Sequence, residues 1–139
     1  MNDLIQKSIL ALQEKKIPNP ELDIRILLRH CCKNDKEIVL SNIDFRDIDI
    51  EYFKTLISKR LLNEPVSKII NKKSFWKGDF FVNSNVLDPR PETEIIIEET
   101  LYNFDKNKKI DILDIGTGSA CIAISLAKEL PNSKVIAID

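Results

Sequence analysis

The sequence contains little glycine, only 3 of 139 residues, where an average protein has about 7%. Two of the three, Gly116 and Gly118, lie two residues apart. Glycine is required where a backbone bends sharply or approaches a ligand closely. The pair therefore marks a candidate functional turn.

Histidine and cysteine are also scarce. His30 is the single histidine, and the three cysteines include the adjacent Cys31 and Cys32. This odd number and spacing predict neither a disulfide framework nor a zinc site. One histidine in an apolar helical segment also makes a Ser-His-Asp triad or a histidine metal site hard to build. These absences favour a reduced, cytoplasmic protein that holds no metal.

The sequence lacks an excess of charge and a long apolar run. Its 21 Lys and Arg residues nearly balance 22 Asp and Glu residues, for a net charge of -1. A protein that binds nucleic acid through its phosphates carries a basic excess instead. No stretch approaches the roughly 20 apolar residues that span a bilayer, and no secretory leader is visible. We expect neither direct nucleic-acid binding nor a membrane association.

Residues 1–64 have the apolar spacing of helices. Asn19 before Pro20 predicts an N-cap and a helix start, and a short helix is expected at Asp35–Leu40. Asp49 is the expected cap of a further helix, which Pro65 interrupts. The pattern predicts a small helical bundle. Its apolar stripes contain Leu4, Ile5, Ile9, Leu12, Leu22, Ile26, Leu27, His30, Cys31, Phe53, Leu56, Ile57 and Leu61.

The spacing of the apolar residues changes after this helical region. Two short runs of aromatic and β-branched residues flank Gly78 and predict a β-hairpin. Phe81 is expected to pack in the core, whereas Phe75 and Trp76 are explained equally well by core packing and by lining a pocket. The predicted strands are Ser74–Trp76 and Phe80–Val82, joined by residues 77–79.

Two prolines flank Arg90, so two φ angles are fixed and two backbone donors are absent. Pro91 can also begin a helix. One interpretation is a linker followed by a helix start. The other is that the prolines hold Arg90 and Thr93 at the edge of a cleft.

The last 30 residues follow a strand–turn–helix–strand pattern. Residues 110–115 and 134–139 are apolar strands, Gly116–Ala120 form a turn, and Cys121–Leu130 have helical spacing. Such a β-α-β unit predicts a parallel sheet with a right-handed crossover.

A ligand that lies across this turn would meet the free N–H groups and positive dipole of the helix start. Asp139 ends the second strand about 20 residues after the first glycine, where an acid can bind ribose hydroxyls. The dinucleotide motif G-x-G-x-x-G/A fits poorly, because its last position is Cys121. Asp114, followed by Gly116-Thr-Gly118-Ser-Ala120, is instead similar to motif I of the class I methyltransferases.

The order of motifs along the chain resembles one methyltransferase family, the release factor N5-glutamine methyltransferases (PrmC/HemK). The matching stretches are Glu64-Pro65-Val66, Ser74-Phe75-Trp76, Phe81-Val82, Pro89 to Glu94, and Asp114 to Gly118. The resemblance covers nearly the whole chain. It implies a fold class of α plus α/β: a substrate-docking helical bundle (1–70), a β-hairpin connector (71–90), and the first β-α-β of a Rossmann-like class I methyltransferase domain (91–139), truncated.

The resemblance implies methyl transfer from S-adenosylmethionine to the glutamine side chain in the Gly-Gly-Gln motif of peptide chain release factors. The implied cofactor contacts are Gly116, Thr117, Gly118, Ser119, Ala120 and Asp139, and the substrate-side candidates are Phe75, Arg90 and Thr93. Two alternatives stay open: a release-factor-binding module without activity, and a fragment of a methyltransferase that modifies ribosomal-protein glutamine.

The sequence departs from the family pattern at three places. Ala120 stands where the family has a third glycine, which predicts weaker cofactor binding, and Asn71 replaces a glycine before the hairpin. The chain contains no Asn-Pro-Pro-Tyr, the motif that in this family orients the substrate amide, so no catalytic residue is assigned. Because such positioning lowers a reaction barrier by several kcal/mol, we expect no methyl transfer by this chain alone and a missing C-terminal half.

Overall fold

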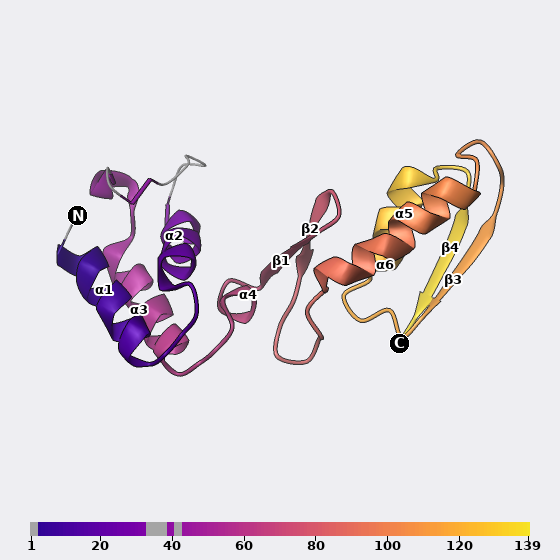
Figure 1. Ribbon diagram of the computed structural model, residues 1–139. Coiled ribbons are helices and arrows are strands. Elements are labelled where there is room, and N and C mark those ends of the chain that lie inside the picture. The colour runs from indigo at the N-terminus through magenta and orange to yellow at the C-terminus, as the bar shows by residue number, and fades with distance from the viewer. Residues whose placement is uncertain (1–2, 33–38, 41–42) are drawn as a thin grey trace. The chain divides into compact units, whose positions relative to one another are not determined.

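The computed structural model of the protein describes residues 3–32, 39–40 and 43–139. It consists of two compact units, Met1–Ile70 and Asn71–Asp139, coloured from indigo to yellow along the chain in Figure 1. The first unit contains α1 (Asp3–Glu14), α2 (Pro20–His30), the 3-10 helix η1 (Phe45–Asp47), α3 (Ile50–Leu61) and α4 (Val66–Ile69). The second contains β1 (Lys72–Phe75), β2 (Gly78–Phe81), the 3-10 helix η2 (Pro91–Thr93), α5 (Glu94–Asn103), β3 (Asp111–Ile115), α6 (Cys121–Glu129) and β4 (Lys134–Ile138).

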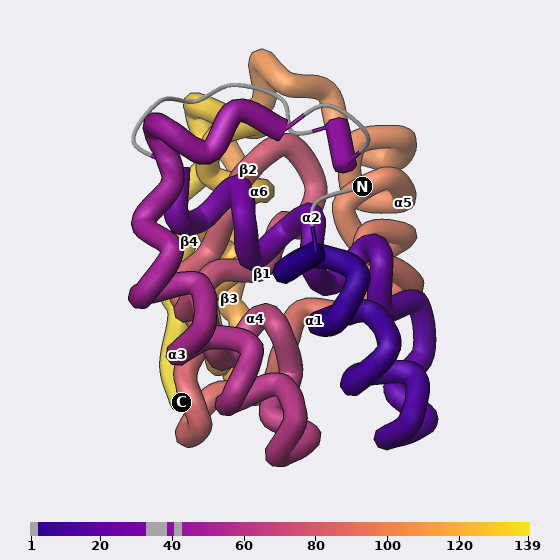
Figure 2. Tube along the Cα trace, turned by 90° about the vertical axis from the view of Figure 1, so that its left-hand side faces the viewer, coloured from indigo at the N-terminus to yellow at the C-terminus, as the bar shows by residue number. Residues whose placement is uncertain are grey.

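The first unit is the predicted helical bundle. Helices α1, α2 and α3 pack pairwise against one another (Figures 1 and 2), and α4 packs on α2 and α3. The stripes of α1 and α3 face inward, as the spacing of their residues predicts. The stripe of α2 is rotated from the predicted one: Ile24 and Leu28 are fully buried, whereas the expected packing of Leu22 and His30 is wrong, because both are exposed. The short helix expected at Asp35–Leu40 lies mostly outside the described residues. The fully buried side chains of this core are Ile5, Leu12, Ile24, Leu27, Leu28, Phe53 and Leu56.

The two predicted helix caps differ in outcome. The cap at Asp49 is confirmed, because its Oδ1 accepts a hydrogen bond from the Tyr52 N–H at 2.9 Å. The N-cap position of Asn19 and the helix start at Pro20 are also confirmed, but Asn19 has φ 51° and its side chain makes no capping hydrogen bond. Asparagine tolerates this left-handed conformation, so here it reverses the chain between α1 and α2 rather than capping α2 through its side chain.

A half-buried ion pair joins α2 to α3. Arg60 Nε donates to Asp23 Oδ2 at 2.7 Å, and each side chain is only 13% exposed. Arg60 Nη1 also donates to the Glu64 carbonyl at 3.2 Å. The charge of Arg60 therefore depends on Asp23 for its compensation.

The cysteine thiols are free where the structure describes them, and Cys31 and Cys121 are buried. Burial, with Asp49 nearby, raises the pKa of the Cys31 thiol to about 11. Within the described part of the chain, no helix combines the length and the hydropathy that a membrane crossing requires.

The second unit begins with an antiparallel hairpin whose register differs from the predicted one. Phe75 pairs with Gly78, so the turn is Trp76–Lys77 and the glycine lies in the second strand. The expected core position of Phe81 is wrong: Phe81 is 66% exposed, whereas Phe80 is 7% exposed. The two-residue turn places Phe75 and Phe80 on one face, edge to face at 6.1 Å, because side chains alternate across a strand.

The predicted strand–turn–helix–strand order is confirmed. Strands β3 and β4 pair in parallel from Asp111–Lys134 to Ile115–Ile138. Helix α6 packs on this ladder and α5 packs against α6 (Figure 1). Their shared core contains Phe75, Phe80, Ile97, Cys121, Leu126 and Leu130.

Candidate functional site

The turn between β3 and α6 contains three residues in the left-handed region. Gly116 has φ 77°, Gly118 φ 52° and Ala120 φ 58°. The N–H groups of Gly116 and Thr117 both donate to the Ile138 carbonyl, at 2.8 and 3.0 Å. The glycines are therefore needed for backbone conformation, and the turn is fastened to the end of β4.

Two carboxylates meet this turn. Asp114 Oδ2 accepts from Thr117 Oγ1 at 2.8 Å, and Asp139 Oδ1 accepts from the Gly118 N–H at 3.4 Å. Asp114 is near the end of β3 and Asp139 follows β4. Because parallel strands end at the same edge of a sheet, the pairing brings both acids to one place. The structure thus joins the residues that the sequence predicted as one site.

The turn is open toward a ligand. A Cβ on Gly116 would meet no heavy atom within 4 Å, and Ala120, at the N-cap of α6, has no side-chain capping bond. The first N–H groups of α6 lie beyond the half-buried Ser119 and carry the positive end of the helix dipole. Open space, backbone donors and an exposed carboxylate suit an uncharged or cationic ligand with hydroxyl groups.

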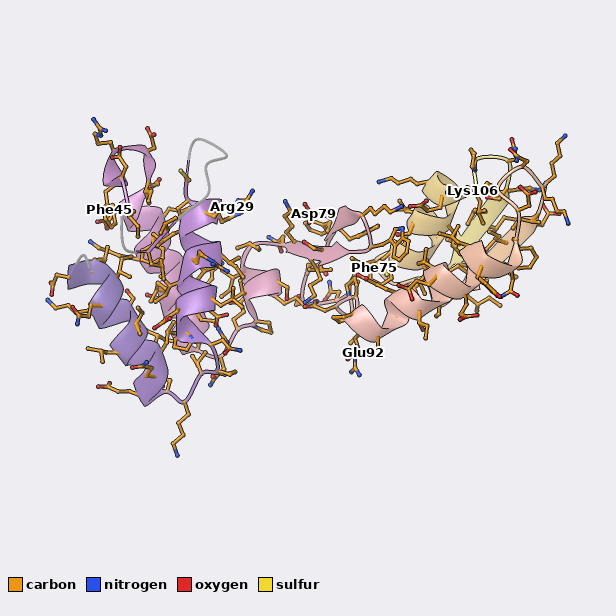
Figure 3. All side chains as sticks on the ribbon, turned by 45° about the horizontal axis from the view of Figure 1, so that its top comes forward. Arg29, Phe45, Phe75, Asp79, Glu92 and Lys106 are labelled. Atoms are coloured by element: carbon orange, nitrogen blue, oxygen red, sulfur yellow. The ribbon has the colours of Figure 1, made fainter. Side chains whose placement is uncertain are left out.

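The substrate-side candidates do not lie together at this turn. Arg90 is exposed and Thr93 half-buried, and they are joined by a hydrogen bond from the Thr93 N–H to the Arg90 carbonyl at 3.0 Å. Phe75 is 1% exposed and lies in the core of the second unit, labelled in Figure 3. The structure therefore places Phe75 in packing rather than in a pocket wall. Trp76 instead borders a cavity of about 30 Å³.

A polar cluster at the hairpin turn has no counterpart among the sequence motifs. Glu129 Oε1 accepts from Trp76 Nε1 at 2.8 Å and from Lys77 Nζ at 2.5 Å, and Glu94 Oε1 accepts from the Trp76 N–H at 2.7 Å. The hydrogen bonds from Lys77 and Trp76 lower the pKa of Glu129, and the bond from Lys77 contributes most. Trp76 and Lys77 lie 53 and 52 residues before Glu129 in the chain, so no local sequence motif indicates this contact.

The described residues contain no group of three or more His, Cys, Asp or Glu side chains placed to hold a metal ion. The site is therefore built from backbone donors, glycine conformations and two carboxylates.

Replacing Ala120 with glycine should stabilise the second unit by about 1 kcal/mol, because an alanine at φ 58° carries the cost of a left-handed conformation. Trp76 is the only tryptophan and lies in this unit, so its fluorescence during urea unfolding measures the change. Ala123→Gly, in the interior of α6, is the control and should destabilise by about 1 kcal/mol. A loss of stability with Ala120→Gly would show that the left-handed conformation of Ala120 does not cost stability.

Comparison with known proteins identifies relatives over most of the chain. The family model described as PrmC N-terminal domain matches residues 3–70. A bifunctional methyltransferase of Rickettsia prowazekii is 39% identical over 86% of the chain and 27% of the relative. The release factor glutamine methyltransferases of Caulobacter vibrioides and Buchnera aphidicola subsp. Acyrthosiphon pisum are each 36% identical, over 92% and 97% of the chain and 45% and 48% of the relatives. The chain thus spans between about a quarter and a half of the length of these curated relatives.

Proposed function

Because this chain belongs to the PrmC family of release factor glutamine methyltransferases, we propose that it supplies the substrate-docking domain and part of the cofactor site of such an enzyme. In this proposal residues 1–70 dock the substrate protein, residues 71–90 are the hairpin connector, and residues 91–139 belong to a Rossmann-like class I methyltransferase domain. The enzyme acts in the cytoplasm.

The proposed cofactor is S-adenosylmethionine, which supplies the methyl group. The observation that carries this proposal is the turn Gly116–Ala120, fastened to β4 and flanked by two carboxylates. Backbone groups of the turn, with Thr117 and Ser119, contact the methionine part, and Asp139 exchanges its weak bond to Gly118 for the ribose hydroxyls. The residues present fit this cofactor, since the space above Gly116 is open.

The proposed substrate is the glutamine of the Gly-Gly-Gln motif in peptide chain release factors, with Arg90 and Thr93 on the substrate side. A glutamine amide is a poor nucleophile, because its nitrogen lone pair is delocalised into the carbonyl. These 139 residues contain no Asn-Pro-Pro-Tyr to orient it. The polypeptide by itself is therefore proposed to be inactive.

The test compares two proteins in a methylation assay with radiolabelled S-adenosylmethionine and a bacterial release factor. One is this chain, and the other is this chain continued by the sequence of the Caulobacter relative that follows its matching region. We expect label in the release factor only with the continued chain, and none in a release factor whose motif glutamine is replaced by alanine. Label transferred by the 139 residues alone would refute their inactivity. A folded continued chain that transfers none would refute the function.

A binding role without chemistry is the second candidate, because the first unit has a hydrophobic core of its own. Titration calorimetry of the chain with a release factor tests it. Heat above dilution, together with no methylation by the continued chain, would favour a binding module over an enzyme.

A further inference from the structure

Trp76 is held in an unusual conformation by polar contacts to two helices. Its φ of 53° is an outlier for a bulky residue that is neither glycine nor asparagine. Its backbone N–H donates to Glu94 at the start of α5, and its indole N–H donates to Glu129 at the end of α6. Such strain persists only where the surroundings enforce it, and it often marks a functional constraint.

The hairpin and the loop that follows it lie near the two ends of α6. Its tip is bonded to Glu129, the last residue of the helix. In the segment that follows β2, Val86 Cγ1 lies 4.0 Å from the position of a Cβ on Gly118, in the turn before the helix. Between these two points, Phe75 and Phe80 of the hairpin share a hydrophobic core with Cys121 and Leu126 of α6.

The tip of the hairpin depends on these polar bonds because its packing is incomplete. A cavity of about 30 Å³ lies between the tip and α6, lined by Trp76, Gly78, Ser125, Lys128 and others. A void contributes no van der Waals contact. By contrast, the charged Glu129 carboxylate is mostly buried, with its side chain 12% exposed, and bonds to a charged group are stronger than neutral ones.

We propose that Trp76 and Glu129 are positioning residues. Their bond holds the tip of the hairpin against the end of α6, and through the hairpin it keeps Val86 of the following loop next to the glycine turn. This inference rests on the proposed function in one respect, that the turn is where the cofactor binds. The loop that leads to Arg90 then takes its position from a contact at the opposite end of the helix.

The test is hydrogen exchange, followed by mass spectrometry, on the 139-residue chain with Trp76→Phe. Phenylalanine keeps an aromatic ring but removes the indole donor. We expect exchange to become about tenfold faster in residues 83–90 and 116–120, since a charge-assisted bond is lost. Exchange within the β3–β4 ladder should stay within about twofold. Tyr102→Phe, at a side chain that is 87% exposed, is the control and should change neither region.

Glu129→Ala removes this bond and also the bond from Lys77, so it should speed exchange in the same two segments at least as much as Trp76→Phe does. Adding Trp76→Phe to Glu129→Ala should change little, because the indole bond is already lost. Faster exchange confined to the hairpin, or spread evenly over the whole second unit, would overturn the proposal. Titration with S-adenosylhomocysteine separates it from the proposed function. We expect about tenfold weaker binding by Trp76→Phe. If the continued wild-type chain binds none while the exchange pattern is as expected, the positioning bond stands and the cofactor site is refuted.

Discussion

Replacing Asp23 with alanine is expected to lower the free energy of unfolding of the first unit by about 3 kcal/mol. The substitution removes the partner of Arg60, whose side chain is only 13% exposed between α2 and α3. A buried charge that loses its partner pays the cost of desolvation without compensation. Urea unfolding followed by far-ultraviolet circular dichroism measures the loss. Trp76 fluorescence, which reports the second unit, should keep its midpoint.

The control is Asp3→Ala, which removes an ion pair of the same short length. Lys7 Nζ lies 2.7 Å from Asp3 Oδ2, but the Asp3 and Lys7 side chains are 79% and 73% exposed. Water screens such a pair, so we expect a loss of about 0.5 kcal/mol or less. Equal losses for the two variants would show that burial does not decide the contribution of the Asp23–Arg60 pair.

The parts of the fold that could be predicted are those with local signals. The strand Asp111–Ile115 and the helix that begins at Cys121 lie within one residue of their predicted limits. An apolar run, two glycines and a helical period follow one another directly there. The cap at Asp49 was equally local, because its acceptor and donor are three residues apart.

The hairpin register could not be predicted, because the sequence offers two adjacent phenylalanines and only one can face the core. Phe80 and Phe81 point to opposite faces of the strand. The choice is made by Ile97 and Leu126 in α5 and α6, which pack on the face that bears Phe80. Burial of that ring enforces the Trp76–Lys77 turn, although glycine is the residue that prefers a positive φ.

The residues of the candidate site and its surroundings also fall into those with a local sequence signal and those without one. Gly116, Gly118 and Asp114 were found from their spacing, and the structure brings Asp139 to them through the parallel pairing of β3 and β4. Their role in cofactor binding stays a prediction. Glu129 was missed, because it acts on a residue 53 positions earlier in the chain, and such a contact leaves no periodic pattern.

Replacing Phe75 with alanine is expected to destabilise the second unit by about 4 kcal/mol. The ring is 1% exposed and packs edge to face with Phe80, so truncation loses its transfer free energy and leaves a cavity. Urea unfolding followed by Trp76 fluorescence measures the loss. A loss this large would show that the ring contributes to the core rather than to a substrate contact.

Phe81→Ala is the matched control, since it removes the same ring from the same hairpin at a side chain that is 66% exposed. Truncation there leaves no cavity, so the free energy of unfolding should change by about 0.5 kcal/mol or less. A small effect at Phe75 together with a large one at Phe81 would reverse the two faces of the hairpin. Phe75 would then have the accessibility that a substrate contact requires.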